Sequence, residues 1–251
     1  MAERIWTAAL CVIGDEILSG RTQDKNIAQI ATWLNVQGIR LGEVRVVADD
    51  MTAIGDAVKA LAPKHDYLFT TGGIGPTHDD ITVDAIAAAL GLGTSVHPQA
   101  RAILEDYYVD KGGLTEARLR MARTPDGASL IVNQRSGAPG IHIGNIFILA
   151  GVPHIAAAML DSLTGKLEGG RPLISVTIGG WIQESEVADL LARVERDHSG
   201  SQIGSYPFFR EGRTGANFVI RSTDPGVLAA CESALMAALL ARGYEAVAGG
   251  I

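Results

Sequence analysis

The residues best suited to chemistry lie between positions 71 and 82, in the sequence TGGIGPTHDDIT. Its glycines, Gly72, Gly73 and Gly75, allow the backbone to turn sharply and to approach a ligand closely. The segment follows an apolar run at 67–71 that is typical of a buried strand, and ligands of open parallel sheets bind beyond the carboxyl ends of the strands. A helix is expected to begin near Asp80, and the free N–H groups of its first turn favour an anion. Such a loop suits a phosphate.

Two carboxylates, Asp79 and Asp80, follow the glycines directly. Beside a bound phosphate they would be repulsive unless a cation such as Mg²⁺ bridges carboxylate and phosphate oxygens. The pattern therefore indicates a metal-bound phosphate. A plain turn explains the same residues in another way, with Asp80 as a helix cap and Thr77 as a local hydrogen-bonding group.

Known nucleotide motifs do not fit this loop. The sequence lacks GxxxxGK[ST], and the residues after Gly73 and Gly75 do not have the spacing of the dinucleotide fingerprint, which argues against a P-loop NTPase and a nicotinamide dehydrogenase. His78 could transfer protons, but its position also suits an ordinary exposed loop histidine.

A second polar turn, Gly14-Asp15-Glu16, follows the first apolar run. We expect it at the same edge of the sheet, where one of its acids could complete a metal or base position. A helix-capping role explains these acids equally well.

The elements that would position these residues follow an α/β pattern. Short apolar runs alternate with amphipathic stretches as far as about residue 170, which predicts a mostly parallel sheet covered by helices. The expected strands are 5–13, 42–47, 67–71, 129–132 and 145–150, and the expected helices are 24–37, 52–62, 81–90 and 99–109. Beyond 170 we expect a strand at 173–178, a helix at 184–197, two strands around a turn at 210–212, a helix at 225–240 and a strand at 244–247. The sequence thus predicts two domains, 1–170 and a small β-α-β-β-α-β unit at 171–251.

Composition narrows the possible partners and compartment. The 251 residues are 47% hydrophobic and 20% charged, with a net charge of −7, so the chain has the composition of a globular protein and no excess of basic residues to bind nucleic acid. The apolar run at 5–13 is neither a signal peptide nor long enough to span a bilayer, so we expect no membrane association and a cytoplasmic protein. Cys11 and Cys231 lie in apolar segments and are expected to be buried thiols.

Several motifs together resemble one family, the MoaB/Mog molybdopterin-binding domain. They are IGDEILSGRTQDKN at 13–26, VVADD at 46–50, TGGIGPTHDDIT at 71–82, Asn133, GAPG at 137–140 and GVP at 151–153. The resemblance spans about residues 5–165 and is strongest to the N-terminal part of CinA-like proteins and to the corresponding domain of eukaryotic FAD synthases. The segment 175–247 is similar to the small KH-type region that follows this domain in CinA-like proteins. The resemblance implies a three-layer α/β/α fold with a small α+β domain after it.

The resemblance also implies a function. CinA-like and FAD-synthase-like members are associated with metal-dependent hydrolysis of nucleotide pyrophosphates such as FAD or ADP-ribose, and Mog-like members bind molybdopterin. The implied cofactor is Mg²⁺, Mn²⁺ or Co²⁺, and the ligand is a nucleotide or a pterin. Carried onto this chain, the phosphate or ligand residues are Gly72, Gly73, Gly75, Pro76, Thr77, Asn26, Asp49, Gly151 and Pro153, the metal residues are Asp79 and Asp80, and the catalytic residues are Asp79, Asp80 and Asp15.

The chain departs from the family pattern at one position. Where family members commonly carry an acid two residues after the proline of the GVP turn, this chain has Ile155. A non-catalytic nucleotide-binding module is therefore a third reading of the same residues. We also expect neither the amidase activity of CinA-like proteins nor FAD synthesis, and we expect a symmetric homo-oligomer.

Overall fold

The computed structural model describes residues 4–251, and the chain divides into two compact units that are joined between Gly170 and Arg171. The first unit is built on a six-stranded sheet in the order β2-β1-β3-β8-β7-β6. The first four strands of that order are parallel to one another. Strand β7 is antiparallel to both of its neighbours, β8 and β6. The strands are β1 (Trp6–Ile13), β2 (Ile39–Val47), β3 (Tyr67–Thr71), β6 (Ser129–Ile131), β7 (Gly140–Ile143) and β8 (Ile146–Leu149).

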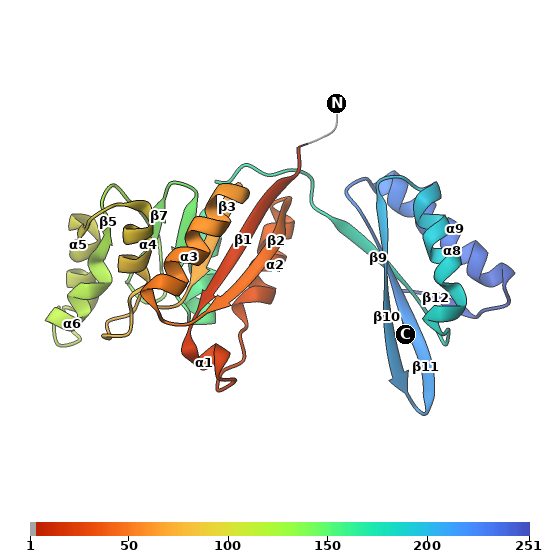
Figure 1. Ribbon diagram of the computed structural model, residues 1–251, viewed down its shortest axis with the longest axis horizontal. Coiled ribbons are helices and arrows are strands. Elements are labelled where there is room, and N and C mark those ends of the chain that lie inside the picture. The colour runs from red at the N-terminus through yellow and green to blue at the C-terminus, as the bar shows by residue number, and fades with distance from the viewer. Residues whose placement is uncertain (1–3) are drawn as a thin grey trace. The chain divides into compact units, whose positions relative to one another are not determined.

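Helices cover both faces of this sheet, as Figure 1 shows for α3 (Met51–Leu61) and α4 (Thr82–Leu90) on the near side. The central strand β1 explains the layering, because its side chains alternate between the two faces. Leu10 packs in one core with residues of α2 (Asn26–Val36) and α7 (Pro153–Leu163), and Cys11 packs in a second core with residues of α3 and α4. The predicted α/β/α architecture is confirmed.

The first unit also contains a small lobe that the sequence only partly predicted. It consists of α5 (Pro98–Tyr108), α6 (Glu116–Leu119), η2 (Arg120–Ala122) and the two-stranded sheet of β4 (Thr94–Val96) and β5 (Arg123–Pro125). Ala100, Leu104 and Ala122 are its fully buried centre. The short elements α1 (Asp15–Leu18) and η1 (Ala62–Lys64) complete the unit. Only α5 was expected, because the other elements of the lobe are too short to show a clear periodicity.

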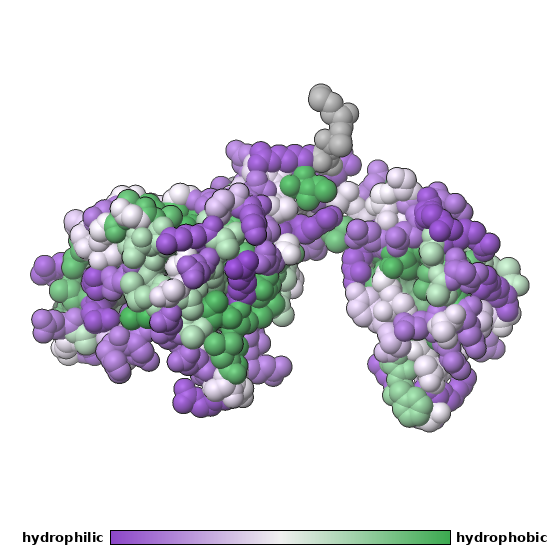
Figure 2. All heavy atoms as spheres, viewed as in Figure 1, coloured by the Kyte–Doolittle hydropathy of each residue, from purple (hydrophilic) through white to green (hydrophobic). Residues whose placement is uncertain are grey.

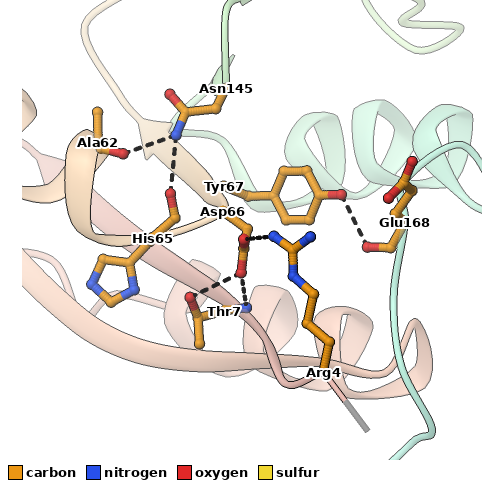
Figure 3. Close-up of polar contacts among 8 residues, drawn as sticks. All are labelled: Arg4, Thr7, Ala62, His65, Asp66, Tyr67, Asn145 and Glu168. Atoms are coloured by element: carbon orange, nitrogen blue, oxygen red, sulfur yellow. Dashed lines mark hydrogen bonds and ion pairs between the residues drawn. The ribbon is translucent and has the colours of Figure 1, made fainter.

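A network of paired polar groups fixes the amino ends of the parallel strands (Figure 3). The Asp66 carboxylate accepts hydrogen bonds from the backbone N–H and hydroxyl of Thr7 and from the guanidinium of Arg4. The Asn145 amide donates to the carbonyl oxygens of Ala62 and His65 at 2.9 and 3.1 Å. The ends of β1, β3 and β8 are therefore tied together by groups whose hydrogen-bonding capacity is used within the protein.

The second unit has the predicted order β-α-β-β-α-β and an antiparallel sheet in the order β10-β11-β9-β12. Its elements are β9 (Ile174–Gly180), α8 (Glu184–Asp197), β10 (Ser201–Arg210), β11 (Arg213–Ser222), α9 (Pro225–Ala241) and β12 (Ala246–Ala248). Ile178, Leu190, Phe218 and Leu235 belong to its own buried core. Apolar atoms are exposed at the free end of the β10–β11 hairpin (Figure 2), where Phe209 is 72% exposed.

Both cysteines are free and buried, as predicted, and burial raises the pKa of the Cys11 thiol to about 12. Among the described helices, none combines the length and the apolar character that crossing a membrane requires.

Candidate functional site

A cleft of about 600 Å³ opens where the four parallel strands end. Loops that follow each of these strands line it: Gly14 and Glu16 after β1, Asp49 after β2, the glycine loop after β3, and Gly151 to Pro153 after β8. This is the edge at which open α/β sheets bind ligands, and the volume suits a small molecule. The predicted residues that line it are Gly72, Gly73, Gly75, Pro76, Asp79, Asp80, Asp49, Gly151 and Pro153.

The glycine loop has a backbone conformation that favours glycine at two positions. Gly72 and Gly73 have φ values of 100° and 65°. A Cβ at 72 would lie 2.1 Å from the carbonyl oxygen of Ile13, and a Cβ at 73 would collide with the hydroxyl of Thr82. Thr82, which is fully buried, donates from its hydroxyl to the Gly72 oxygen at 2.9 Å and from its N–H to the Gly73 oxygen at 3.1 Å. The loop is therefore held in shape before any ligand arrives.

Asp80 and Thr77 contribute to the shape of the loop. One carboxylate oxygen of Asp80 accepts from the N–H of Thr77 at 2.8 Å and from its hydroxyl. Helix α4 runs from Thr82 to Leu90, within one residue of the helix expected at 81–90. Thr77 is not among the described residues that line the cleft, and its donors are already used. Asp80 therefore closes a local turn with one oxygen and faces the cleft only in part.

Four carboxylates line the cleft, on Glu16, Asp49, Asp79 and Asp80, and no Lys or Arg is found among the described residues that line it. Arg120 lies in a separate small pocket with Gly73 and Gly75, and it donates to the backbone oxygen of Asp80 at 3.4 Å. The described residues that line the cleft therefore make it acidic, and Arg120 is a positive group that adjoins the glycine loop from the neighbouring pocket.

The acids of the first two loops lie close together. Asp49 accepts a hydrogen bond from the backbone N–H of Asp15 at 2.9 Å. Burial raises the pKa of Asp49, and the negative charges of Asp15, Glu16 and Asp79 raise it further, although that hydrogen bond acts in the opposite direction. Of the two acids in the Gly14-Asp15-Glu16 turn, Glu16 lines the cleft and Asp15 is not among the described residues that line it. The resemblance had pointed to Asp15.

Asn26 supports the site from behind. Its side chain is 3% exposed, and its amide donates to the carbonyl oxygen of Gly151 at 2.7 Å. Asn26 is not among the described residues that line the cleft, so it positions the loop after β8. Pro153 is the first residue of α7, a helix that the sequence had read only as a turn. Ile155 on this helix lines the cleft and packs against the core, at the position where the resemblance implies an acid.

The donor chemistry fits a divalent cation, but the residues do not form a complete cage. Carboxylate oxygens are the ligands that Mg²⁺ and Mn²⁺ prefer, and the mutual repulsion at Asp49 would be relieved by a cation. Within residues 4–251 no three His, Cys, Asp or Glu side chains are grouped closely enough to hold a metal by themselves. A cation would therefore need oxygens from the ligand as well. His78 is 99% exposed, as expected for a loop histidine, and does not line the cleft in the described structure.

Other residues of the cleft escaped the sequence reasoning. Tyr108 and Met121 from the small lobe line it, together with Ser136 and Ala138. Ala138 belongs to the GAPG motif, which gave some signal, but nothing in the sequence ties Tyr108 or Met121 to the glycine loop. Their contribution depends on how the lobe packs.

Comparison with known proteins agrees with this fold. Residues 9–169 match the family model described as "Probable molybdopterin binding domain", and residues 172–247 match the model of the FAD synthase middle domain. The chain belongs to the molybdopterin-binding domain family.

Relatives cover different shares of their own lengths. A protein of Pyrococcus horikoshii is 35% identical over 198 residues, which cover 73% of this chain and 78% of the relative. A CinA-like protein of Desulfosudis oleivorans is 34% identical over 69% of this chain and only 42% of its own length. The crystal structure of the protein CinA from Thermoplasma acidophilum, described as of unknown function, has 33% identity and a TM-score of 0.60, and the match covers 64% of this chain and 98% of that one.

Proposed function

We propose that this chain is a metal-dependent nucleotide pyrophosphatase that acts on a dinucleotide such as FAD or ADP-ribose. The observation that carries the proposal is a preformed glycine loop beside four carboxylates, with no Lys or Arg among the described residues that line the cleft. A pyrophosphate would be repelled by these acids unless a divalent cation came with it. The arrangement therefore favours a metal-bound pyrophosphate over a bare anion.

The proposed reaction is hydrolysis of the bond between one phosphorus and the bridging oxygen. Water adds to that phosphorus, the bridging oxygen leaves with the other phosphate, and two monophosphates form. A bound divalent cation supplies charge neutralisation at the phosphate oxygens. The glycine loop lets backbone approach the phosphates, and Asp79 accepts a proton from the attacking water or orients it. Asp80, with one oxygen held by Thr77, keeps the loop in position.

The test is hydrolysis of FAD and ADP-ribose by the purified protein with Mg²⁺, Mn²⁺ or Co²⁺, with both monophosphate products measured. Asp79→Asn should abolish the metal-dependent activity. Asp56→Asn is the matched control, because Asp56 is an exposed acid on α3 that does not line the cleft in the described structure. Equal cleavage by the native protein and Asp79→Asn would sink the proposal.

The family match favours a second candidate, a molybdopterin-binding protein of cofactor biosynthesis. A pterin bearing a phosphate would use the same loop, so ligand binding at the glycine loop does not by itself distinguish the two candidate functions. Co-purification of a pterin that is lost in Gly73→Val, without cleavage of any dinucleotide, is the result this candidate predicts. Nucleotide binding without turnover would instead identify a binding module, in keeping with Ile155.

We also expect a small-molecule ligand to bind in this cleft. In addition, we expect the chain to form a symmetric homo-oligomer. Light scattering of the purified chain measures that state directly, and a monomeric mass would contradict the expectation.

A further inference from the structure

The cleft has a second wall that differs in chemistry from the strand-end loops. It is formed by Tyr108 at the end of α5, Met121 in η2, and Ser136 and Ala138 in the loop between β6 and β7. None of these four side chains is charged. Met121 and Tyr108 also pack against the buried centre of the small lobe, so this wall is part of a folded core.

Tyr108 is fixed in place by its neighbours. The guanidinium of Arg118 lies over its ring, with the guanidinium carbon 4.2 Å from the ring centroid. The rings of Tyr107 and Tyr108 form a T-shaped pair, with centroids 5.0 Å apart and an angle of 88° between the ring planes. Arg118 is itself held by donating to the carbonyl oxygens of Lys111 and Gly113. Arg118 covers one face of the Tyr108 ring. The part of the ring that Arg118 and Tyr107 leave uncovered is therefore the surface available to the cleft.

The adjoining loop is equally well defined. Asn133, which is 9% exposed, donates to the Ser136 hydroxyl and the Ala138 oxygen, both at 2.7 Å, and accepts from the N–H of Arg135. A side chain at Gly137 would collide with the Tyr107 ring, so the loop packs tightly against the end of α5. This wall therefore does not need a ligand to assemble it.

We propose that Tyr108 and Met121 form a subsite for the planar heterocycle of the ligand, such as the base of a nucleotide, while the glycine loop holds its phosphates. Aromatic rings and the Met sulfur both make favourable contacts with a planar ring, and such stacking tolerates different heterocycles. The subsite rests on the proposed function for the position of the phosphates. It makes Tyr108 and Met121 specificity residues, since neither reaches the reacting phosphorus in this assignment.

The experiment compares two ligands that share a phosphate and differ by the ring. AMP and ribose 5-phosphate are titrated calorimetrically, each with Mg²⁺, into the native chain, Tyr108→Phe and Tyr108→Ala. The native chain and Tyr108→Phe should bind AMP about tenfold or more tightly than ribose 5-phosphate, and Tyr108→Ala should lose that preference while binding ribose 5-phosphate unchanged. Tyr206→Ala is the matched control, because Tyr206 is 48% exposed in the second unit.

Thermal unfolding of each variant shows whether the small lobe is still folded, and Tyr108→Leu, which keeps apolar bulk without a ring, should lose the preference as Tyr108→Ala does. Equal affinities of the native chain for the two ligands, or equal losses for both ligands in a folded Tyr108→Ala, would overturn the subsite. If AMP binds through Tyr108 but FAD and ADP-ribose are not cleaved, the subsite stands and the pyrophosphatase falls. If cleavage occurs with the same KM in native and Tyr108→Ala protein, only the subsite falls.

Discussion

The two ends of the parallel sheet in the first unit use the same residue types in opposite ways. At the amino end, Asp66 accepts hydrogen bonds from Thr7 and Arg4, and Asn145 donates to two carbonyl oxygens (Figure 3). At the carboxyl end, four carboxylates line a cleft that no Lys or Arg of the described chain lines. The carboxylate at the amino end is paired within the protein, whereas the four carboxylates at the carboxyl end have no Lys or Arg beside them in the described lining of the cleft.

The difference between the two ends indicates that the acidic cleft lowers the stability of the folded chain in exchange for ligand binding. A carboxylate with partners in the folded state stabilises it, whereas clustered carboxylates without counter-charges destabilise it. Neutralising an acid should therefore have effects of opposite sign at the two ends, and replacing a glycine of the loop should damage both stability and function.

The largest effect is expected from Gly72→Ala. A Cβ at this position would lie 2.1 Å from the Ile13 oxygen, and the residue has a positive φ of 100°. We expect a loss of about 3 kcal/mol in the free energy of unfolding in urea, from strain and overlap together. Gly91→Ala is the control, because Gly91 has φ 70° with no atom near its Cβ position, and it should cost about 1–2 kcal/mol. Equal losses would show that the close approach to β1 is unimportant.

Asp49→Asn should lower metal-dependent turnover about 100-fold and raise the melting temperature of the ligand-free protein. The pKa of Asp49 is raised by burial and by neighbouring negative charges, so its ionised form is less favourable in the folded state than in the unfolded state. Neutralisation removes that penalty, and an asparagine oxygen can still accept from the N–H of Asp15. The melting temperature and the initial rate, measured on one preparation, test the expected gain in stability and the expected loss of turnover. A destabilised variant would contradict the comparison of the two ends of the sheet.

Asp66→Ala should have the opposite result, a loss of about 1–2 kcal/mol in stability with turnover retained. Desolvation raises the pKa of Asp66, but hydrogen bonds from Thr7 and Arg4 outweigh it, and the net pKa is lowered. A lowered carboxyl pKa means that the stabilisation is present above the unfolded value of about 4 and is lost as the pH falls through the folded value.

Urea unfolding of native and Asp66→Ala protein between pH 7 and pH 3 should show a constant difference that shrinks only below about pH 4. Asp56→Ala is the control, since Asp56 is an exposed acid on α3. If the difference in the free energy of unfolding between native and Asp66→Ala protein grew as the pH fell, the pKa of Asp66 would not be lowered in the folded state.

The smallest effect is expected from His78→Ala. His78 is 99% exposed and lies 3.9 Å from a carboxylate oxygen of Asp79. Turnover should stay within about twofold of the native rate between pH 6 and 8, as for an ordinary surface substitution. A clear loss with a shifted pH profile would instead make His78 a proton-transfer group of the carboxyl end.

The sequence predicted the sheet class, the order of elements in the second unit, the four parallel strands of the first unit and the glycine loop, since these rest on local patterns. The continuous apolar run of β1 is a local pattern, and so is the capping residue Asp224, which accepts from the N–H groups of Gly226 and Val227. It missed α7, because Pro153 begins a helix as readily as it ends a turn. It placed the start of α4 within one residue, although Asp80 closes a loop turn and does not cap the helix.

The sequence by itself determined which residues form the loop and that acids stand beside it, because these neighbours are adjacent in the chain. Only the tertiary structure decided that Glu16 lines the cleft in place of Asp15, that Asn26 acts from behind through Gly151, and that Tyr108 and Met121 supply a second wall. These contacts join segments far apart in the sequence. Their geometry is set by how helices and the small lobe pack on the sheet, and no local pattern encodes that packing.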